Sequence, residues 1–342
     1  MLRKTLAAGL LLLTAACGGT GGATASSPSS TGAGGTVTVY TVDGLAGWYG
    51  KRAEEFKAKT GITVQLVESG SGEVVTRAER EKANPQADVL VTLPPFIQRA
   101  DKAGLLADYA PAGSDQVPAG QKSGKYTAVV NNYLNFIYNP KLATPAPTTW
   151  NDLLDPRFKG KFQYSTPGQA GDGTAVLLQL KHVLGDQGAL DYLAKLEANN
   201  VGPSSSTGKL QPKVSKGEIW VANGDLQMNL TSIRDDKSEF QVFFPADDKG
   251  ARSTFAIPYY AGLATGAPHA DNGRKFLDFL LSSEVQQTVA ADALGRPVRG
   301  DVPATGQISE LLKGVEVWQP DWTSVVATLD ADVAAYTKAV GR

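Results

Sequence analysis

The chain has 342 residues, and its composition is that of a globular protein, with 42% apolar, 20% charged and 8% aromatic residues. This length is enough for about two domains of ordinary size. Lysine and arginine number 33 and aspartate and glutamate 34, so the net charge is −1. That balance argues against a protein that binds nucleic acid, because such proteins normally carry a basic excess. One cysteine and two histidines leave little material for a disulfide or a metal site, and we expect no metal and no cofactor.

The first 35 residues predict an export signal followed by a tether. A short basic start precedes an apolar run over 6–13 that is too short to span a bilayer, which is typical of a signal peptide covering 1–16. Small residues before Cys17 resemble the bacterial lipoprotein box, and we expect lipidation of Cys17; ordinary signal cleavage beside an incidental cysteine is the alternative. Residues 18–35 contain only Gly, Ala, Ser, Thr and Pro, which predicts a flexible linker over 17–35. We therefore expect an extracytoplasmic protein that a lipid anchor holds at the cell membrane.

Strand and helix patterns alternate from residue 36 onward. The first part predicts three strands, each followed by a helix, over 36–42, 45–59, 62–66, 73–83, 88–93 and 96–103. A long strand-like run over 125–138 follows. The next part predicts strands over 161–165, 218–222, 226–230, 239–245 and 254–264, with helices over 172–184 and 188–198. Helices dominate the last part, over 270–282, 283–292 and 321–340. This order is typical of an α/β fold with open parallel sheets and crossover helices.

Two lobes joined by a hinge are the domain organisation that this order predicts. We assign residues 36–135 together with 246–342 to lobe 1, and residues 136–245 to lobe 2. Strand-like crossings near 130–138 and 243–258 join the lobes, and we expect each lobe to be a mostly parallel sheet flanked by helices. Ligands in such sheets bind beyond the carboxyl ends of the strands, so we expect the site in the cleft between the lobes.

Two turns rich in Gly, Ser and Thr lie between a predicted strand and a predicted helix. They cover 68–73 and 165–174, one in each predicted lobe. Free backbone N–H groups at the start of a helix, together with the positive end of the helix dipole, form a site that favours anions. Capping alone is the alternative, because Ser71, Asp172 and Thr174 are good helix caps. Two such turns together favour a shared anion site in the cleft.

No catalytic motif is complete in this sequence. Residues 202–210 resemble a phosphate-binding P-loop, but the spacing of the glycines is one residue too long and Leu210 stands where Ser or Thr must hold magnesium. No serine lies in a Gly-x-Ser-x-Gly elbow. We interpret His182, in an amphipathic helix, and His269, after a proline, as structural residues. We therefore expect a binding protein rather than an enzyme, with a secreted hydrolase and a surface adhesion lipoprotein as competing classes.

Four stretches of the chain resemble the 2-aminoethylphosphonate-binding proteins of ABC importers. They read YTVDGL (40–45), VESGSGEVVTRAEREKANPQADVLVTLPPF (67–96), WNDLLDPRFKGKF (150–162) and NGDLQMNLT (223–231). These proteins are relatives of the ferric-ion-binding proteins within the type II periplasmic-binding fold. The resemblance implies a monomeric substrate-binding lipoprotein that delivers a small ligand to a membrane permease, which an ATPase encoded elsewhere powers.

The same resemblance argues against iron as the ligand. The ferric relatives bind iron with neighbouring tyrosines in the stretch that corresponds to 227–230, and that stretch here reads Gln-Met-Asn-Leu. A hard ferric ion needs anionic oxygen ligands, so their absence from this stretch favours an organic anion held by both lobes. Ferric ion or a ferric complex, thiamine, a polyamine, a carboxylate and a sulfonate remain alternative ligands.

The chemistry of 2-aminoethylphosphonate fits candidate residues in the two turns and nearby. Its phosphonate requires N–H groups and hydroxyls, which we expect from Ser71, Gly72, Thr166, Gly171, Gly173 and Thr174. Its ammonium requires a carboxylate or an aromatic face, and we choose Asp43, with Asp172 and Asp225 as alternatives. The methylenes require an aromatic cover, for which the candidates are Trp48, Tyr133 and Tyr259. We expect Thr92 in the wall and Asn229 as a polar contact. A helix cap is the alternative role of Asp43, and core packing that of the aromatic residues.

Overall fold

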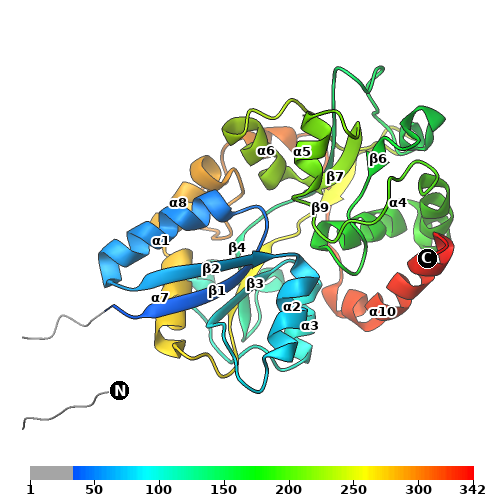
Figure 1. The fold of residues 1–342 in the computed structure, drawn as a ribbon. Coiled ribbons are helices and arrows are strands. Elements are labelled where there is room, and N and C mark those ends of the chain that lie inside the picture. The colour runs from blue at the N-terminus through cyan, green and yellow to red at the C-terminus, as the bar shows by residue number, and fades with distance from the viewer. Residues whose placement is uncertain (1–33) are drawn as a thin grey trace, which may run out of the picture. The chain divides into compact units, whose positions relative to one another are not determined.

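A computed structural model of the chain describes residues 34–342, which form one compact unit (Figure 1). The predicted signal peptide, Cys17 and the linker up to residue 33 lie outside the described residues. Among the helices of the described part, none combines the length and the apolar character needed to cross a membrane.

The first sheet has five strands in the order β2-β1-β3-β10-β4. The strands are β1 (Thr36–Val42), β2 (Thr63–Ser69), β3 (Val89–Thr92), β4 (Tyr126–Val130) and β10 (Tyr259–Leu263). β1 pairs in parallel with β2 and β3, and β10 pairs antiparallel with β3 and β4, so β10 alone runs against the other strands. The helices associated with this sheet are α1 (Ala46–Thr60), α2 (Ser71–Arg80), α3 (Phe96–Lys102), α7 (Ala270–Leu281) and α8 (Ser283–Thr288).

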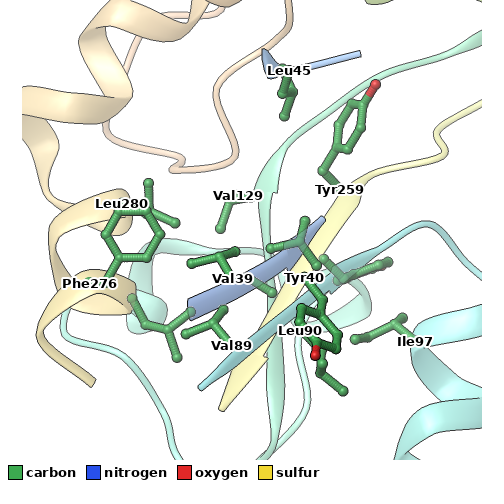
Figure 2. Packing of buried hydrophobic residues seen from close by; sticks show 14 of the residues in the cluster. Val39, Tyr40, Leu45, Val89, Leu90, Ile97, Val129, Tyr259, Phe276 and Leu280 are labelled. Carbon is green, nitrogen blue, oxygen red and sulfur yellow. The ribbon is translucent and has the colours of Figure 1, made fainter. Parts of the chain in front are cut away.

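Helices cover both faces of this sheet because its β-branched strands are apolar on both sides. Val39 packs on the face that Phe276 and Leu280 of α7 cover, while Tyr40 lies on the opposite face, towards Ile97 of α3 (Figure 2). All five side chains are almost completely buried. Fully burying a side chain of this size contributes roughly 1.5–3 kcal/mol to folding, so the core holds the carboxyl ends of the strands in a fixed position.

The second sheet has four strands in the order β6-β7-β5-β8. They are β5 (Leu134–Tyr138), β6 (Phe162–Gln163), β7 (Val221–Asp225) and β8 (Gln241–Phe243), and β5 alone runs against the others. The helices of this part are α4 (Gly171–Leu196), α5 (Leu210–Ser215) and α6 (Leu226–Asp235). A separate two-stranded sheet pairs β9 (Ser253–Phe255) with β11 (Glu316–Trp318), and the remaining helices are α9 (Gln307–Leu311) and α10 (Trp322–Ala339).

The C-terminal helix α10 packs on the core of the second sheet. Tyr336 belongs to that core, and its hydroxyl lies 2.9 Å from the hydroxyl of Tyr164. Our assignment of 246–342 as a whole to lobe 1 therefore differs from the packing of this helix. The lobe boundaries themselves stay a prediction.

The chain passes between the two sheets at two places that lie side by side. The predicted run 125–138 is divided into β4 and β5, which belong to different sheets. Between them, Tyr133 pairs with Ala256, and the N–H of Ile257 donates to the carbonyl of Asn132 at 2.9 Å. Both crossings fall within the segments that we expect to act as hinges.

Several predicted elements differ in the structure, among them the strand predicted over 254–264, which is divided into β9 and β10 of two different sheets. The strand predicted over 226–230 is wrong, because this segment is the first half of α6. The Asp225 carboxylate accepts a hydrogen bond of 2.6 Å from the N–H of Met228 and so caps the helix, a signal that the alternating pattern of the segment masks. The helices predicted over 172–184 and 188–198 form one element, α4, with a non-helical break at Gly185 (φ 74°, ψ 170°).

Candidate functional site

The carboxyl ends of strands from both sheets meet at one small cavity, which we call the inner cavity. β1 ends beside Asp43, β2 leads into α2, β3 leads into Leu93, and β7 ends at Asp225. The lining residues are Val42, Asp43, Gly70, Ser71, Leu93, Ala170, Gly171, Asp172, Ser205, Ser206, Thr207, Asp225 and Met228. The cavity measures about 20 Å³, which is room for about one water molecule. It lies where the topology of an α/β sheet places ligands.

The N-termini of α2 and α4 face each other across the inner cavity. A methyl group added at Gly171, the first residue of α4, would lie 2.9 Å from the hydroxyl oxygen of Ser71, the first residue of α2. The N–H of Gly72 donates to the carbonyl of Gln169 at 3.1 Å, a direct link between the two helix starts. The N-cap of α4 is Ala170, which has no side-chain acceptor for the N–H groups of the first turn. Two converging helix N-termini favour an anion.

The start of α4 requires glycine at position 173. A methyl group there would lie 2.2 Å from the carbonyl oxygen of Ser165. Backbone atoms cannot move aside as a flexible side chain can, so we expect Gly173→Ala to lower the free energy of unfolding by about 1–3 kcal/mol. Chemical denaturation measures this loss.

Gly50 supplies the matched control for that substitution. It lies exposed within α1, where an added methyl group meets no atom within 4 Å. Gly50→Ala should raise stability by about 0.5–1 kcal/mol because alanine favours the helix. Equal effects of the two substitutions would contradict the crowding at Gly173.

Three carboxylates line the inner cavity, and they differ in their hydrogen-bond partners. Asp43 accepts hydrogen bonds from the Ser206 hydroxyl and from the N–H of Gly208. Asp225 accepts from the N–H of Met228 at the start of α6 and, at 3.1 Å, from the hydroxyl of Tyr259. Asp172 is 3% exposed, and its Oδ1 atom has no hydrogen-bond partner. No lysine or arginine is among the residues, all within the described part of the chain, that line this cavity.

This arrangement shifts the acid–base equilibria of the site. Burial raises the pKa of Asp172 well above its ordinary range, and the neighbouring carboxylates of Asp225 and Asp43 add to the rise. Burial also raises the pKa of Asp225 to about 6, although the hydrogen bond from the Met228 N–H acts in the opposite direction. The inner cavity therefore holds more negative charge than its own side chains stabilise, and a proton or a cationic group would compensate it.

The structure brings five of the predicted ligand contacts into the lining of the inner cavity: Asp43, Ser71, Gly171, Asp172 and Asp225. Gly72 lines a neighbouring cavity instead. The role of all of these residues in ligand binding stays a prediction.

The other predicted contacts lie behind the cavity wall and support it. The Thr92 hydroxyl donates to the carbonyl of Ser71 at 3.1 Å, and the Thr166 hydroxyl accepts from the N–H of Ser204 at 3.0 Å. The Thr174 hydroxyl accepts from the N–H of Gly168 at 2.9 Å, which closes the turn before α4. These hydroxyls hold the loops in place.

The remaining predicted contacts are also engaged elsewhere. Asn229 pairs with Asn135 and Gln211 in a buried amide network, with both distances 3.0 Å. The Tyr259 hydroxyl donates to Asp225, as described above. Trp48 and Tyr133, the alternative covers for the methylenes, lie in hydrophobic clusters.

Sequence reasoning missed the segment 205–207, which lines the inner cavity with three hydroxyl-bearing residues. The Thr207 hydroxyl oxygen lies 2.9 Å from that of Ser165, and Ser206 contacts Asp43 from the opposite side of the cavity. The run of Ser and Thr between Gly202 and Gly208 was the available signal. The P-loop spacing does not fit it, so the local pattern alone indicates no binding role.

A larger outer cavity of about 560 Å³ adjoins the inner one, with Ser205 lining both. It lies against α2 and α3, and three of its lining residues are Arg77, Arg80 and Arg99. The outer cavity therefore presents positive charge next to the acidic inner cavity. These arginines of the outer cavity attract anionic molecules towards the helix N-termini.

Comparisons with known proteins agree with this architecture. Residues 51–313 match the family model described as bacterial extracellular solute-binding protein. A protein of Salmonella paratyphi A that is provisionally named a 2-aminoethylphosphonate-binding periplasmic protein is 51% identical over 311 residues, which cover 88% of this chain and 91% of that protein. The periplasmic binding protein AfuA of Actinobacillus pleuropneumoniae, solved with fructose-6-phosphate, superposes with a TM-score of 0.79 at 22% identity over 90% of this chain and 99% of that one. A ferric-binding protein of Campylobacter jejuni superposes with a TM-score of 0.72 at 19% identity, over 89% of this chain and 99% of that one.

Proposed function

The chain belongs to the family of bacterial extracellular solute-binding proteins, and from this premise we propose that it binds 2-aminoethylphosphonate for an ABC importer. Its fold is the two-lobed α/β fold of type II periplasmic-binding proteins, with one strand in each of the two larger sheets running against the rest. As a solute-binding protein it captures a small ligand outside the cytoplasm. We further propose which ligand it captures and which membrane proteins receive that ligand.

One observation supports the proposed ligand most directly. The inner cavity combines two converging helix N-termini, which favour an anion, with three carboxylates, which favour a cation. A small zwitterion satisfies both requirements, whereas a simple anion leaves the carboxylates uncompensated and a polyamine leaves the helix N-termini unused. The provisional name of relatives at about half identity agrees with an aminophosphonate.

Binding in this cavity requires the two lobes to separate and then to close around the ligand, which holds the cavity wider than in this structure. A cavity of about 20 Å³ is smaller than any organic phosphonate. Contacts between the Gly72 N–H and the Gln169 carbonyl, and between Ser206 and Asp43, join opposite sides of the cavity. We propose that these contacts form on closure, by a hinge motion at the crossings near residues 132 and 257, and that the ligand favours the closed form by contacting both lobes.

The cellular setting of the protein forms part of the same proposal. We place it outside the cytoplasm, anchored through a lipidated Cys17 and the linker over 17–35, as a monomer. The closed form docks on a membrane permease that an ATPase powers. The protein itself catalyses no reaction and releases its ligand unchanged.

Titration calorimetry and thermal melting test the proposed ligand. We expect 1:1 binding of 2-aminoethylphosphonate at neutral pH, and at a hundredfold excess over Kd a stabilisation of about 2.7 kcal/mol, or roughly 4 °C in Tm. Ferric ion, thiamine, a polyamine, a carboxylate and a sulfonate form the comparison panel. No heat with 2-aminoethylphosphonate, together with tight binding of another member of the panel, would contradict the proposal. Release of free phosphate from the phosphonate would indicate a hydrolase instead.

A further inference from the structure

We propose that Asp172, rather than Asp43, holds the cationic group of the ligand and thereby makes the site selective for amines. This inference rests on the proposed function, because it assumes a ligand that enters the inner cavity with both an anionic and a cationic end. It names the residue on which discrimination between an amine-bearing ligand and its amine-free analogue depends.

The hydrogen bonds of the three carboxylates distinguish their roles. Asp43 joins the opposite side of the cavity through Ser206 and Gly208, so its carboxylate is a closure contact. Asp225 caps α6 and accepts from Tyr259, so its carboxylate is occupied by protein donors. The Oδ1 atom of Asp172 is buried and has no partner, although Asp172 lines the cavity. An unpartnered buried carboxylate oxygen costs stability unless a donor arrives, and a ligand ammonium is such a donor.

The charges around Asp172 strengthen the requirement for a cation. The ionisable groups that influence it or its neighbours are Asp43, Asp225, Tyr259 and Glu68, all of which are acids. The Thr207 hydroxyl and the N-terminus of α4 are the groups that favour its ionised form. An ammonium placed at Oδ1 would compensate the whole group of carboxylates at once.

The position of Asp172 in α4 also gives each end of the ligand its own partner. Asp172 is the second residue of α4, directly after Gly171, whose backbone faces Ser71 across the cavity. The anion-favouring N–H groups and the unpartnered carboxylate oxygen therefore belong to the same helix turn. A short zwitterion can contact both without any basic side chain in the lining.

Matched ligand pairs and isosteric variants test the inference. We compare 2-aminoethylphosphonate with ethylphosphonate, and taurine with ethanesulfonate, on the wild type and on Asp172→Asn, Asp43→Asn and the exposed control Asp191→Asn. Removing one partner of a buried charge pair weakens binding strongly, so Asp172→Asn should weaken 2-aminoethylphosphonate by about 30-fold or more while ethylphosphonate changes by less than about threefold. Asp43→Asn should weaken both members of a pair alike, because it removes a closure contact. The control Asp191→Asn should change neither.

The outcomes separate this inference from the proposed function. Equal weakening of both pair members in Asp172→Asn, or an amine-selective loss in Asp43→Asn, overturns the inference while the proposed ligand stands. Selective loss with the taurine pair, in a wild type that binds no phosphonate, supports the inference and overturns the proposed ligand. A wild type that binds neither pair overturns both.

A measurement on the wild type covers the case in which the variant does not fold. Carbon-13 NMR of aspartate carboxyl groups at neutral pH should show Asp172 ionised with 2-aminoethylphosphonate bound and protonated with ethylphosphonate bound. The same protonation state with both ligands would overturn the inference.

Discussion

Replacing Gln227 by alanine should lower the free energy of unfolding by about 2–4 kcal/mol, because this side chain joins three segments of the fold. Gln227 is 1% exposed. Its Nε2 atom lies 3.0 Å from the carbonyl oxygen of Gly44 and 2.7 Å from that of Ala293. Its Oε1 atom lies 3.1 Å from the hydroxyl oxygen of Tyr259. Alanine would remove the donor from the carbonyls of Gly44 and Ala293, and each buried group left without a partner costs about 1–3 kcal/mol unless the structure relaxes.

Urea denaturation measures this loss of stability. Two further variants, one a control and one a conservative substitution, show its cause. Gln187→Ala removes an exposed glutamine of α4 that bonds only to Asp191, so it should change stability by less than about 0.5 kcal/mol. Gln227→Glu keeps the acceptor for Tyr259 but loses both amide hydrogens, and it should be as destabilising as alanine or more so. A loss in Gln227→Ala no larger than in the control would show that Gln227 does not act as a bridge.

The bridging role of Gln227 also explains a difference from the ferric-ion-binding relatives. The resemblance places their iron-binding tyrosines in the stretch 227–230. Here the Gln227 side chain donates to the carbonyl of Gly44, and the Asn229 side chain belongs to a buried amide network with Asn135. The sequence excluded a tyrosine pair from that stretch but not the possibility that the residues replacing it still contact ligand. Only tertiary contacts reveal that these two side chains are engaged in the framework.

Local patterns predicted the first strand and helix of the first sheet well, because their signals are strong and agree with one another. The β-branched run that forms β1 and the glycine after α1 place these elements within one or two residues. The pattern over 226–230 predicted a strand because Leu226, Met228 and Leu230 alternate as strand residues do. The cap at Asp225 instead begins a helix there. A capping residue and an alternating pattern conflict in such a short segment, and tertiary packing decides between them.

The candidate site was predictable in its loops but not in its individual contacts. Glycine and hydroxyl residues between a strand and a helix located both helix starts that form the inner cavity. Whether a hydroxyl points into the cavity or holds a loop depends on partners distant in sequence, as for Thr92, which bonds to Ser71. The same holds for the acids: Asp43 stands at a strand end as expected, yet Ser206 and Gly208, far along the chain, occupy its carboxylate.

Closure of the lobes brings three carboxylates into one small cavity, and this couples closure to pH. Burial raises the pKa of Asp172 well above its ordinary range and that of Asp225 to about 6. In an open form these groups face water and should titrate near the ordinary aspartate value of about 3.9. A group with a higher pKa in the closed form takes up a proton on closure, so closure becomes more favourable as pH falls. The effect should extend from neutral pH down to about pH 4, below which both forms are protonated.

Small-angle X-ray scattering should therefore show the ligand-free protein becoming more compact between about pH 8 and about pH 5. Asp172→Asn, which resembles the protonated acid, should be more compact than the wild type at pH 8 and should change less on acidification, with Asp225 accounting for the remaining change. Saturating 2-aminoethylphosphonate should also remove the pH dependence in the wild type, because its ammonium compensates the carboxylates without a proton. A radius of gyration that does not change with pH in the ligand-free wild type, or that changes as much in Asp172→Asn, would show that the buried carboxylates do not control closure.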